Sequence, residues 1–242
     1  MIALKKQETF SFITKLCKGL QDELTALTET TTIDNVVVGI TRTEAELRAI
    51  YHGDVIDTHA VEEGVVGGTV HLITTRATAV RIARIRGKLN DTDDYMNNDI
   101  YMKPVVKAMY DVSTYLFGTI NDCIEADLGK KIGLELKHTE SFKKGDDGYP
   151  ESIDITGEYI QISGKFKIEG GEPEDFHILV SGALFRYLFD DLVVPDDQIP
   201  GVPTKGTDKE IEVLHTCVMA LLKLDNGRSQ GRIVEFLKDR FI

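Results

Sequence analysis

The chain has 242 residues, 42% of them hydrophobic and 28% charged, so it is long enough to close a hydrophobic core as one large domain or two small ones. A balance of 40 acidic against 28 basic residues gives a net charge of -12, which argues against a nucleic-acid backbone as the main partner. No apolar run approaches the roughly 18–20 residues that a membrane-spanning helix needs, so we expect a cytoplasmic protein that does not enter a membrane.

The N-terminal part of the chain alternates helical and extended patterns. Apolar residues at helical spacing predict an amphipathic helix within residues 1–27, and a β-branched run predicts a strand at 36–40. Thr43 has the sequence context of an N-cap for a short helix. Two further strands, 54–60 and 69–74, are separated by glycines and predict a hairpin.

A short basic helix is predicted after the hairpin, with Thr75 as its N-cap and Gly87 as its terminator. It carries basic side chains with no acidic residue between them: Arg76, Arg81, Arg84, Arg86 and Lys88. Such a sequence is typical either of a solvated helix or of a surface that attracts an acidic protein. On the second interpretation, Arg76, Arg81 and Arg84 contribute to partner binding.

The most informative segment is a long helix that begins near Pro104, a residue suited to the first turn of a helix. One side is expected to be buried because apolar residues recur every three or four positions: Val105, Met109, Val112, Leu116, Ile120 and Cys123. The other side is a polar ribbon that we expect to face solvent: Lys107, Asp111, Thr114, Gly118, Asn121 and Glu125. A glycine inside a helix costs about 0.5–1 kcal/mol. Gly118 therefore indicates either a close helix contact or room for a docking partner.

The remainder of the chain begins with short extended segments and ends with helical ones. Strands are predicted at 131–138, 152–156, 158–163, 165–168 and 176–180, and helices at 183–192, 207–224 and 230–241, with a proline-rich linker at 195–203. An internal repeat relates residues 53–128 to 157–224, because the order strand, strand, helix, helix occurs twice. The repeat favours one α+β domain over two independent domains.

Sequence motifs of the common enzyme and metal-binding classes are missing from the chain. The run from His52 to His59 contains metal-ligand residue types, but on one strand His52 and Asp54 face one side while Asp57 and His59 face the other. The acidic loop at 91–94 lacks the glycine of a calcium loop. We therefore predict no metal site. Three widely spaced cysteines are predicted to be buried reduced thiols: Cys17, Cys123 and Cys217.

Residues 68–134 contain a glycine-led strand, a short alanine-rich helix ending near a glycine, and a long helix with Asp111, Thr114 and Gly118 in register. This progression resembles the CheC, CheX and FliY phosphatases of bacterial chemotaxis, whose long helix carries Glu-x-x-Asn followed four residues later by Gly. The resemblance implies a duplicated α+β fold with a mostly antiparallel sheet and long helices packed on it. It spans residues 1–194 in element order, and residues 195–242 are expected to be a linker and a helical extension packed on the same domain.

The resemblance implies hydrolysis of the aspartyl phosphate on a response-regulator receiver domain, with magnesium supplied by the receiver and no cofactor in this chain. Asp111 takes the place of the family glutamate and Thr114 that of the asparagine, which would be the catalytic pair. Lys107, Gly118 and Asn121 would contact the partner. Because threonine lacks the amide, a non-catalytic binding or assembly module, of the chemotaxis or flagellar-switch kind, is the alternative. A homodimer is a further possible assembly.

Overall fold

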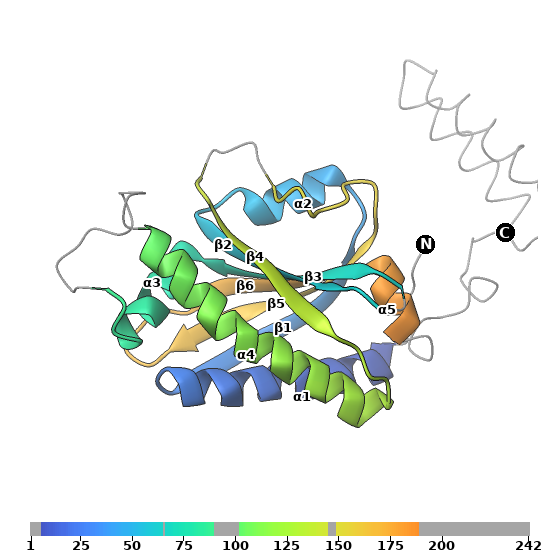
Figure 1. Cartoon of the computed structure of the whole chain (residues 1–242), viewed down its shortest axis with the longest axis horizontal. Helices are drawn as coiled ribbons and strands as arrows, with labels where there is room; N and C mark the ends of the chain where they lie inside the picture. The colour runs from blue at the N-terminus through green and yellow to red at the C-terminus, as the bar shows by residue number, and fades with distance from the viewer. Residues whose placement is uncertain (1–5, 65, 90–101, 145–148, 189–242) are drawn as a thin grey trace, which may run out of the picture. The chain divides into compact units, whose positions relative to one another are not determined.

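The computed structural model describes residues 6–64, 66–89, 102–144 and 149–188, and in these residues helices pack on a single β-sheet (Figure 1). The helices are α1 (Lys6–Leu27), α2 (Glu44–Tyr51), α3 (Arg76–Ile85), α4 (Met102–Leu128) and α5 (Gly182–Leu188). The strands are β1 (Thr31–Thr41), β2 (Val55–Glu62), β3 (Gly68–Thr75), β4 (Leu134–Phe142), β5 (Tyr159–Ile168) and β6 (Glu174–Ser181). The predicted α+β class is confirmed.

Several predicted segments lie outside the described residues. These are the linker at 195–203, the helices at 207–224 and 230–241, and the last four residues of the helix predicted at 183–192. The proposed packing of residues 195–242 on the domain therefore stays a prediction. No helix in the described part of the chain is long and apolar enough to cross a membrane.

The sheet has the strand order β1-β5-β6-β3-β2-β4, and every neighbouring pair is antiparallel. Two hairpins, β2–β3 and β5–β6, lie side by side at its centre, and each is followed directly by a helix. The outer strands are exchanged between the halves of the chain. β1 precedes the first hairpin but pairs with β5, whereas β4 precedes the second hairpin but pairs with β2. The two halves therefore form one interlocked sheet.

The two faces of the sheet are covered unequally. The main core joins one face to the apolar sides of α1, α3, α4 and α5. A smaller cluster on the other face joins Leu47, Ile50 and Tyr51 to strand residues such as Ile73 and Leu179. Figure 1 shows α1 and α4 on one side of the sheet and α2 on the other. The face under α2 is also where polar strand residues gather.

The predicted helix starts are confirmed by their hydrogen bonds. The Thr43 hydroxyl accepts from the backbone N–H of Glu46, and the Glu46 carboxylate accepts from the backbone N–H of Thr43, which is a complete capping box. The Thr75 hydroxyl accepts from the N–H of Thr78. Gly87, with a φ of 65°, follows the end of α3 in the left-handed conformation that glycine adopts readily.

The predicted strands differ from the structure in several places: β1 and β4 begin and end at other residues than predicted, the strand at 152–156 is absent, and β5 is not divided. Residues 152–156 form turns, because the Asp154 carboxylate accepts from the backbone N–H of Thr156 at 2.9 Å and from its hydroxyl at 2.7 Å. The predicted break at Gly164 is absent, and β5 runs through it without interruption. A Cβ atom at Gly164 would lie 2.6 Å from the Phe176 ring, so this glycine allows a close side-chain approach and does not form a turn.

Candidate functional site

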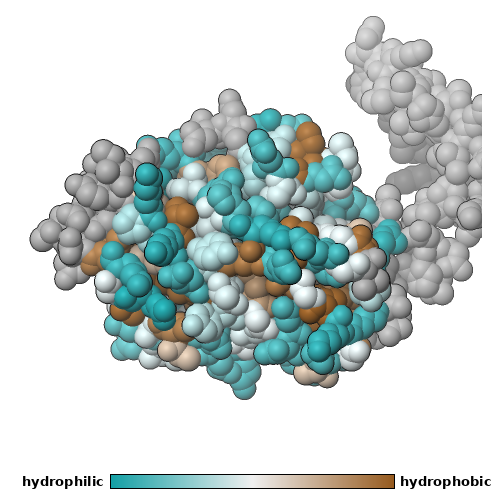
Figure 2. Space-filling view, in the orientation of Figure 1, coloured by the Kyte–Doolittle hydropathy of each residue, from teal (hydrophilic) through white to brown (hydrophobic). Residues whose placement is uncertain are grey.

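The polar side of α4 is exposed as the sequence predicts. Lys107 and Thr114 are exposed and Asp111 is half-buried, while Met109 and Val112 on the opposite side are buried. We call Lys107, Asp111, Thr114 and Gly118 the α4 strip. The face that carries α4 is largely hydrophilic with small hydrophobic patches (Figure 2). The strip is therefore available for contact with another molecule, as far as the described residues show.

Gly118 faces open space. A Cβ atom built on it would meet no atom of another described element within 4 Å, so no helix in the described part of the chain makes the close contact that would explain this glycine. Gly19 of α1 is the glycine at a close helix approach, because its Cβ would lie 3.2 Å from both Cys123 and Thr119 of α4. Gly118 thus leaves a smooth patch on an exposed helix, where the backbone of a partner can come close.

Two exposed tyrosines flank the strip. Tyr110 is 39% exposed and Tyr115 is 52% exposed. Beside Tyr110, a shallow hollow of about 370 Å³ separates α4 from β4, with Lys107 on one side and His138 and Thr139 on the other. Aromatic residues are enriched where protein partners bind, since they bury a large area with few rotatable bonds. Exposed aromatic side chains beside a shallow hollow are features that protein-docking surfaces share.

Asp111 and Thr114 lie one helical turn apart, but the threonine hydroxyl is engaged within the helix. It donates to the backbone carbonyl of Tyr110 at 3.1 Å, so only its lone pairs remain to hold a water molecule. A carboxamide offers a donor and an acceptor together and reaches further from the helix. The arrangement is chemically weaker than an acid and amide pair at orienting a nucleophilic water.

Asn121, predicted to bind the partner, makes a contact within the fold. It is half-buried, and its Oδ1 accepts from the backbone N–H of Leu134 at 3.3 Å, which connects α4 to the start of β4. The side-chain oxygen of Asn121 is therefore already hydrogen-bonded within the domain. We leave Asn121 out of the docking surface proposed below.

The basic helix differs from the expected charged surface. Arg76 is only 2% exposed, and its Nη2 donates to the Ser141 hydroxyl at 2.9 Å. Arg81 is half-buried, donates to the backbone carbonyl of Glu169, and lies 3.6 Å from the Glu29 carboxylate. Arg84 is exposed. The sequence shows a row of like charges but not the distant residues that contact them, and Arg76 and Arg81 make their contacts within the domain.

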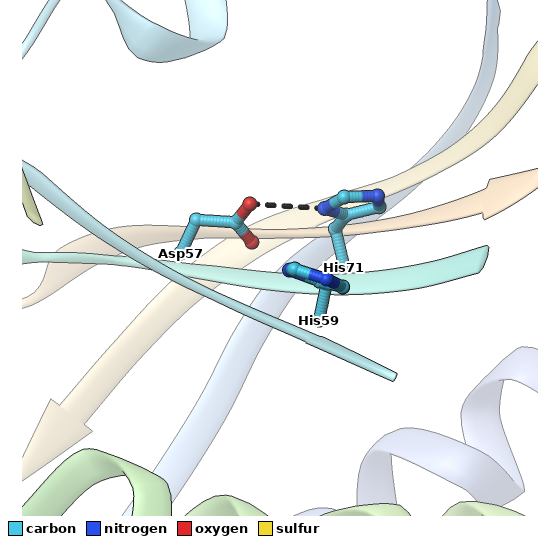
Figure 3. A group of neighbouring side chains, drawn as sticks. All are labelled: Asp57, His59 and His71. Atoms are coloured by element: carbon cyan, nitrogen blue, oxygen red, sulfur yellow. Dashed lines mark hydrogen bonds and ion pairs between the residues drawn. The ribbon is translucent and has the colours of Figure 1, made fainter. Parts of the chain in front are cut away.

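A second polar group lies on the opposite face of the sheet, beneath α2. Asp57 and His59 come from β2, and His71 comes from β3 directly opposite His59 in the ladder (Figure 3). His71 Nδ1 hydrogen-bonds Asp57 Oδ2 at 2.9 Å, and the Tyr51 hydroxyl donates to the same oxygen at 3.2 Å. The rings of His59 and His71 stack with centroids 5.3 Å apart. We call Asp57, His59 and His71 the β2–β3 triad.

Two members of the β2–β3 triad are fully enclosed. Asp57 is 1% exposed and His71 is 0% exposed, yet Asp57 Oδ1 and His71 Nε2 have no hydrogen-bond partner within the described part of the chain. Each such buried polar atom costs about 1–3 kcal/mol. Burial is the main cause that lowers the pKa of His59, with the nearby His71 acting in the same direction. His59 is therefore neutral at neutral pH, and a neutral imidazole is the form that binds metal ions.

The β2–β3 triad does not follow from the pattern of a single strand. The alternation of β2 predicts Asp57 and His59 on one side, as in the structure, but does not show which residue of β3 lies opposite them. The glycines at 64, 67 and 68 mark the hairpin turn and so constrain which residues are opposite each other. Pairing the two strands across that turn would have brought His71 to His59.

Comparison with known proteins identifies the fold. No protein-family model and no curated protein matches the sequence. FliY from Thermotoga maritima superposes with a TM-score of 0.58 at 15% identity, covering 78% of this chain and 97% of that one. The FliM middle domain from H. pylori superposes with a TM-score of 0.56 at 10% identity, covering 75% of this chain and 94% of that one. A chain of the FliM-SpeE complex from H. pylori superposes with a TM-score of 0.57 at 9% identity, covering 75% of this chain and 90% of that one. The expected FliY-like fold is confirmed.

Proposed function

We propose that this chain, which has the fold of FliY and of the FliM middle domain, is a docking module of bacterial chemotaxis or flagellar signalling. It binds a response-regulator receiver domain through the α4 strip. The observation that carries the proposal is Gly118, whose missing side chain opens onto free space between exposed side chains of α4. In this proposal the module binds its partner without efficient catalysis.

The energetics of Gly118 favour a partner. A glycine in the middle of a long helix weakens that helix, and at Gly118, which is half-buried, a Cβ atom would gain no contact with the described residues. Close approach of a partner backbone is a physical reason for its presence, since any side chain at this position would separate the two surfaces. Tyr115, next to Thr114 and half exposed, supplies an aromatic anchor beside the gap.

The choice of a receiver domain rests on the resemblance and on the fold. FliY belongs to the phosphatase family whose sequence progression this chain resembles, and it superposes on this chain. In the FliM-SpeE complex, a protein of this fold occurs together with a second protein, so protein binding is a property found among its neighbours. Both observations support a protein partner for this chain.

Aspartyl-phosphate hydrolysis is the second candidate, and a specific observation keeps it: Asp111 and Thr114 lie on the same strip one turn apart. The Thr114 hydroxyl can still accept a hydrogen bond from a water molecule, although it donates to Tyr110. Hydrolysis by this pair requires the receiver to supply its metal ion and most of the charge stabilisation. We expect at most a slow reaction.

The binding proposal is tested by titrating the full chain against purified receiver domains, in phosphorylated and unphosphorylated form, by isothermal calorimetry. Gly118→Arg should weaken binding by at least about tenfold, because a long side chain separates the surfaces. Gly39→Arg is the matched control, since Gly39 of β1 is exposed and a Cβ there also meets nothing within 4 Å. Equal affinities for the two variants and the unaltered protein would exclude the α4 strip as the docking surface.

The catalytic alternative is tested by following the loss of phosphate from the receiver. The unaltered protein should accelerate it only slightly, Thr114→Asn should raise the rate at least about tenfold, and Asp111→Ala in that background should remove the gain. One positioned polar contact stabilises a transition state by about 2–4 kcal/mol. Restoring such a contact should therefore give a measurable gain in rate. A fast unaltered protein that is not slowed by Thr114→Ala would place the chemistry elsewhere.

A further inference from the structure

The β2–β3 triad has the residue types of a metal site. It combines two imidazoles and one carboxylate, the donor set that zinc and other late first-row transition metals accept in proteins. One ligand atom from each residue lies within 4.8 Å of the others. Figure 3 shows the Asp57 carboxylate pointing toward the two histidine rings. The three side chains thus converge from two adjacent strands.

An unpartnered atom of the triad indicates that a ligand completes it. Asp57 Oδ1 is buried without a hydrogen-bond partner in the described residues, although Asp57 is almost completely enclosed. Buried polar groups in folded proteins are nearly always satisfied. An ion bound at this point would use the Asp57 carboxylate and His71 Nδ1, the ring nitrogen that faces Asp57, in place of the hydrogen bond between them.

The second half of the chain provides an internal comparison. At the corresponding place in the β5–β6 hairpin, the Ser163 hydroxyl and His177 Nδ1 are hydrogen-bonded at 2.8 Å. Gln161 Nε2 donates to Ser163 Oγ at 2.8 Å, and Gln161 Oε1 accepts from the Thr41 hydroxyl at 2.6 Å. This group contains no carboxylate and satisfies its own hydrogen bonds. The same face of the sheet can therefore be closed with neutral partners, which the β2–β3 triad does not do.

We propose that Asp57, His59 and His71 form a binding site for a divalent transition-metal ion of the zinc class. Ligand atoms around a tetrahedral zinc ion lie roughly 3.3–3.6 Å apart, and those of the triad lie within 4.8 Å of one another, with 2.9 Å between His71 Nδ1 and Asp57 Oδ2, so small side-chain movements bring them to that spacing. His59 is half-buried and its ring lies beside that of the exposed His138 on β4, with centroids 6.3 Å apart. The ion enters from this side, and a water molecule or a further ligand fills the remaining position.

The proposed ion would stabilise the fold at a defined place. It would tie β2 to β3, and through the Tyr51 to Asp57 hydrogen bond it would also fix α2 on the sheet. This site lies on the face of the sheet opposite to α1 and α4. The ion would therefore stabilise the fold without being part of the α4 strip. An ion that binds only the folded chain raises its stability by mass action.

The test uses the untagged full-length protein with Zn²⁺ and Co²⁺ as probes. Calorimetry should show one ion bound per chain, and the Co²⁺ complex should show visible absorption bands typical of four or five nitrogen and oxygen ligands. His59→Asn and His71→Asn should each lower the affinity by at least about tenfold, comparable to or larger than the loss of an outer-shell partner. His177→Asn, the equivalent change in the second hairpin, should leave the affinity unchanged.

His71 is fully buried, so its variant has to be checked for folding by circular dichroism. If it does not fold, the half-buried His59 decides the question, because its replacement leaves the core intact. Added Zn²⁺ should raise the thermal midpoint of the unaltered protein and of His177→Asn, but not of His59→Asn. Absence of ion binding, or binding that His59→Asn does not weaken, would overturn the proposal.

Discussion

Replacing Gly118 with alanine should stabilise the protein, although Gly118 is the residue on which the docking proposal depends. The new methyl group would meet no atom of the described residues within 4 Å, so it can neither clash nor gain packing. Position 118 lies well inside α4, where the backbone is helical. The only remaining effect is the intrinsic helix preference of alanine over glycine.

That preference sets the magnitude. Alanine is favoured over glycine by about 0.5–1 kcal/mol in a helix interior. For a chain of this size, each kcal/mol shifts the thermal midpoint by roughly 2–4 °C, so we expect a rise of about 1–4 °C. The same substitution adds one carbon atom to the docking surface, so partner binding should weaken while the fold becomes more stable.

Urea denaturation followed by circular dichroism measures the first effect, with Gly19→Ala as the matched control. Gly19 also lies inside a long helix, but a methyl group there would come 3.2 Å from Cys123 Sγ and Thr119 Cγ2, so crowding offsets the helical gain. We expect a smaller stabilisation than for Gly118→Ala. A loss of stability in Gly118→Ala would show that this glycine serves a contact within the protein, and the main argument for docking would be lost.

Further expectations concern caps, thiols and pH. Thr43→Ala removes the capping hydroxyl of α2 and should lower the free energy of unfolding by about 1 kcal/mol in urea titrations, whereas an unchanged value would show that the cap is replaced by water. Burial raises the pKa of the Cys17 thiol to about 11 and also raises that of Cys123, so both should react with iodoacetamide at pH 8 more slowly than a free cysteine, as measured by peptide mass spectrometry. Burial lowers the pKa of His59 and of His177 below 6.5, so the unfolded chain binds more protons, and stability should fall as the pH drops from 7 to 5. Replacing both histidines with asparagine should reduce that fall, and an unaltered pH dependence would contradict the assignment.

Features that depend on local physics were predicted well from the sequence. The apolar stripe of α4, with Met109, Val112 and Leu116 buried, follows from the helical period alone. The caps at Thr43 and Thr75 need only a hydroxyl and an N–H three residues later. The exposure of Thr114 is determined by the same period. None of these features requires knowledge of distant residues.

Features that depend on distant residues were not predicted. Arg76 is buried because Ser141, far along the chain, lies within reach of its guanidinium group. His71 joins Asp57 only through the pairing of β2 with β3. The hydrogen bond from the Thr114 hydroxyl to the Tyr110 carbonyl is different, because it is local and threonine in a helix commonly forms it, so it can be expected from the sequence. The exposed strip along one helix could thus be predicted from the sequence, whereas the polar group that two strands build could not be predicted from one strand alone.

The exchange of outer strands determines how a mechanical load on α4 is distributed. α4 leads directly into β4, and the only strand that holds β4 in the described sheet is β2, from the other half of the chain. A pull on α4 therefore reaches the β2–β3 hairpin before it reaches β5 and β6, which follow β4 in sequence. Neither half can be drawn away without breaking a strand pair of the other, because β1 pairs with β5 and β4 pairs with β2. The interlocked pairing therefore makes the two halves of the sheet depend on each other for their stability.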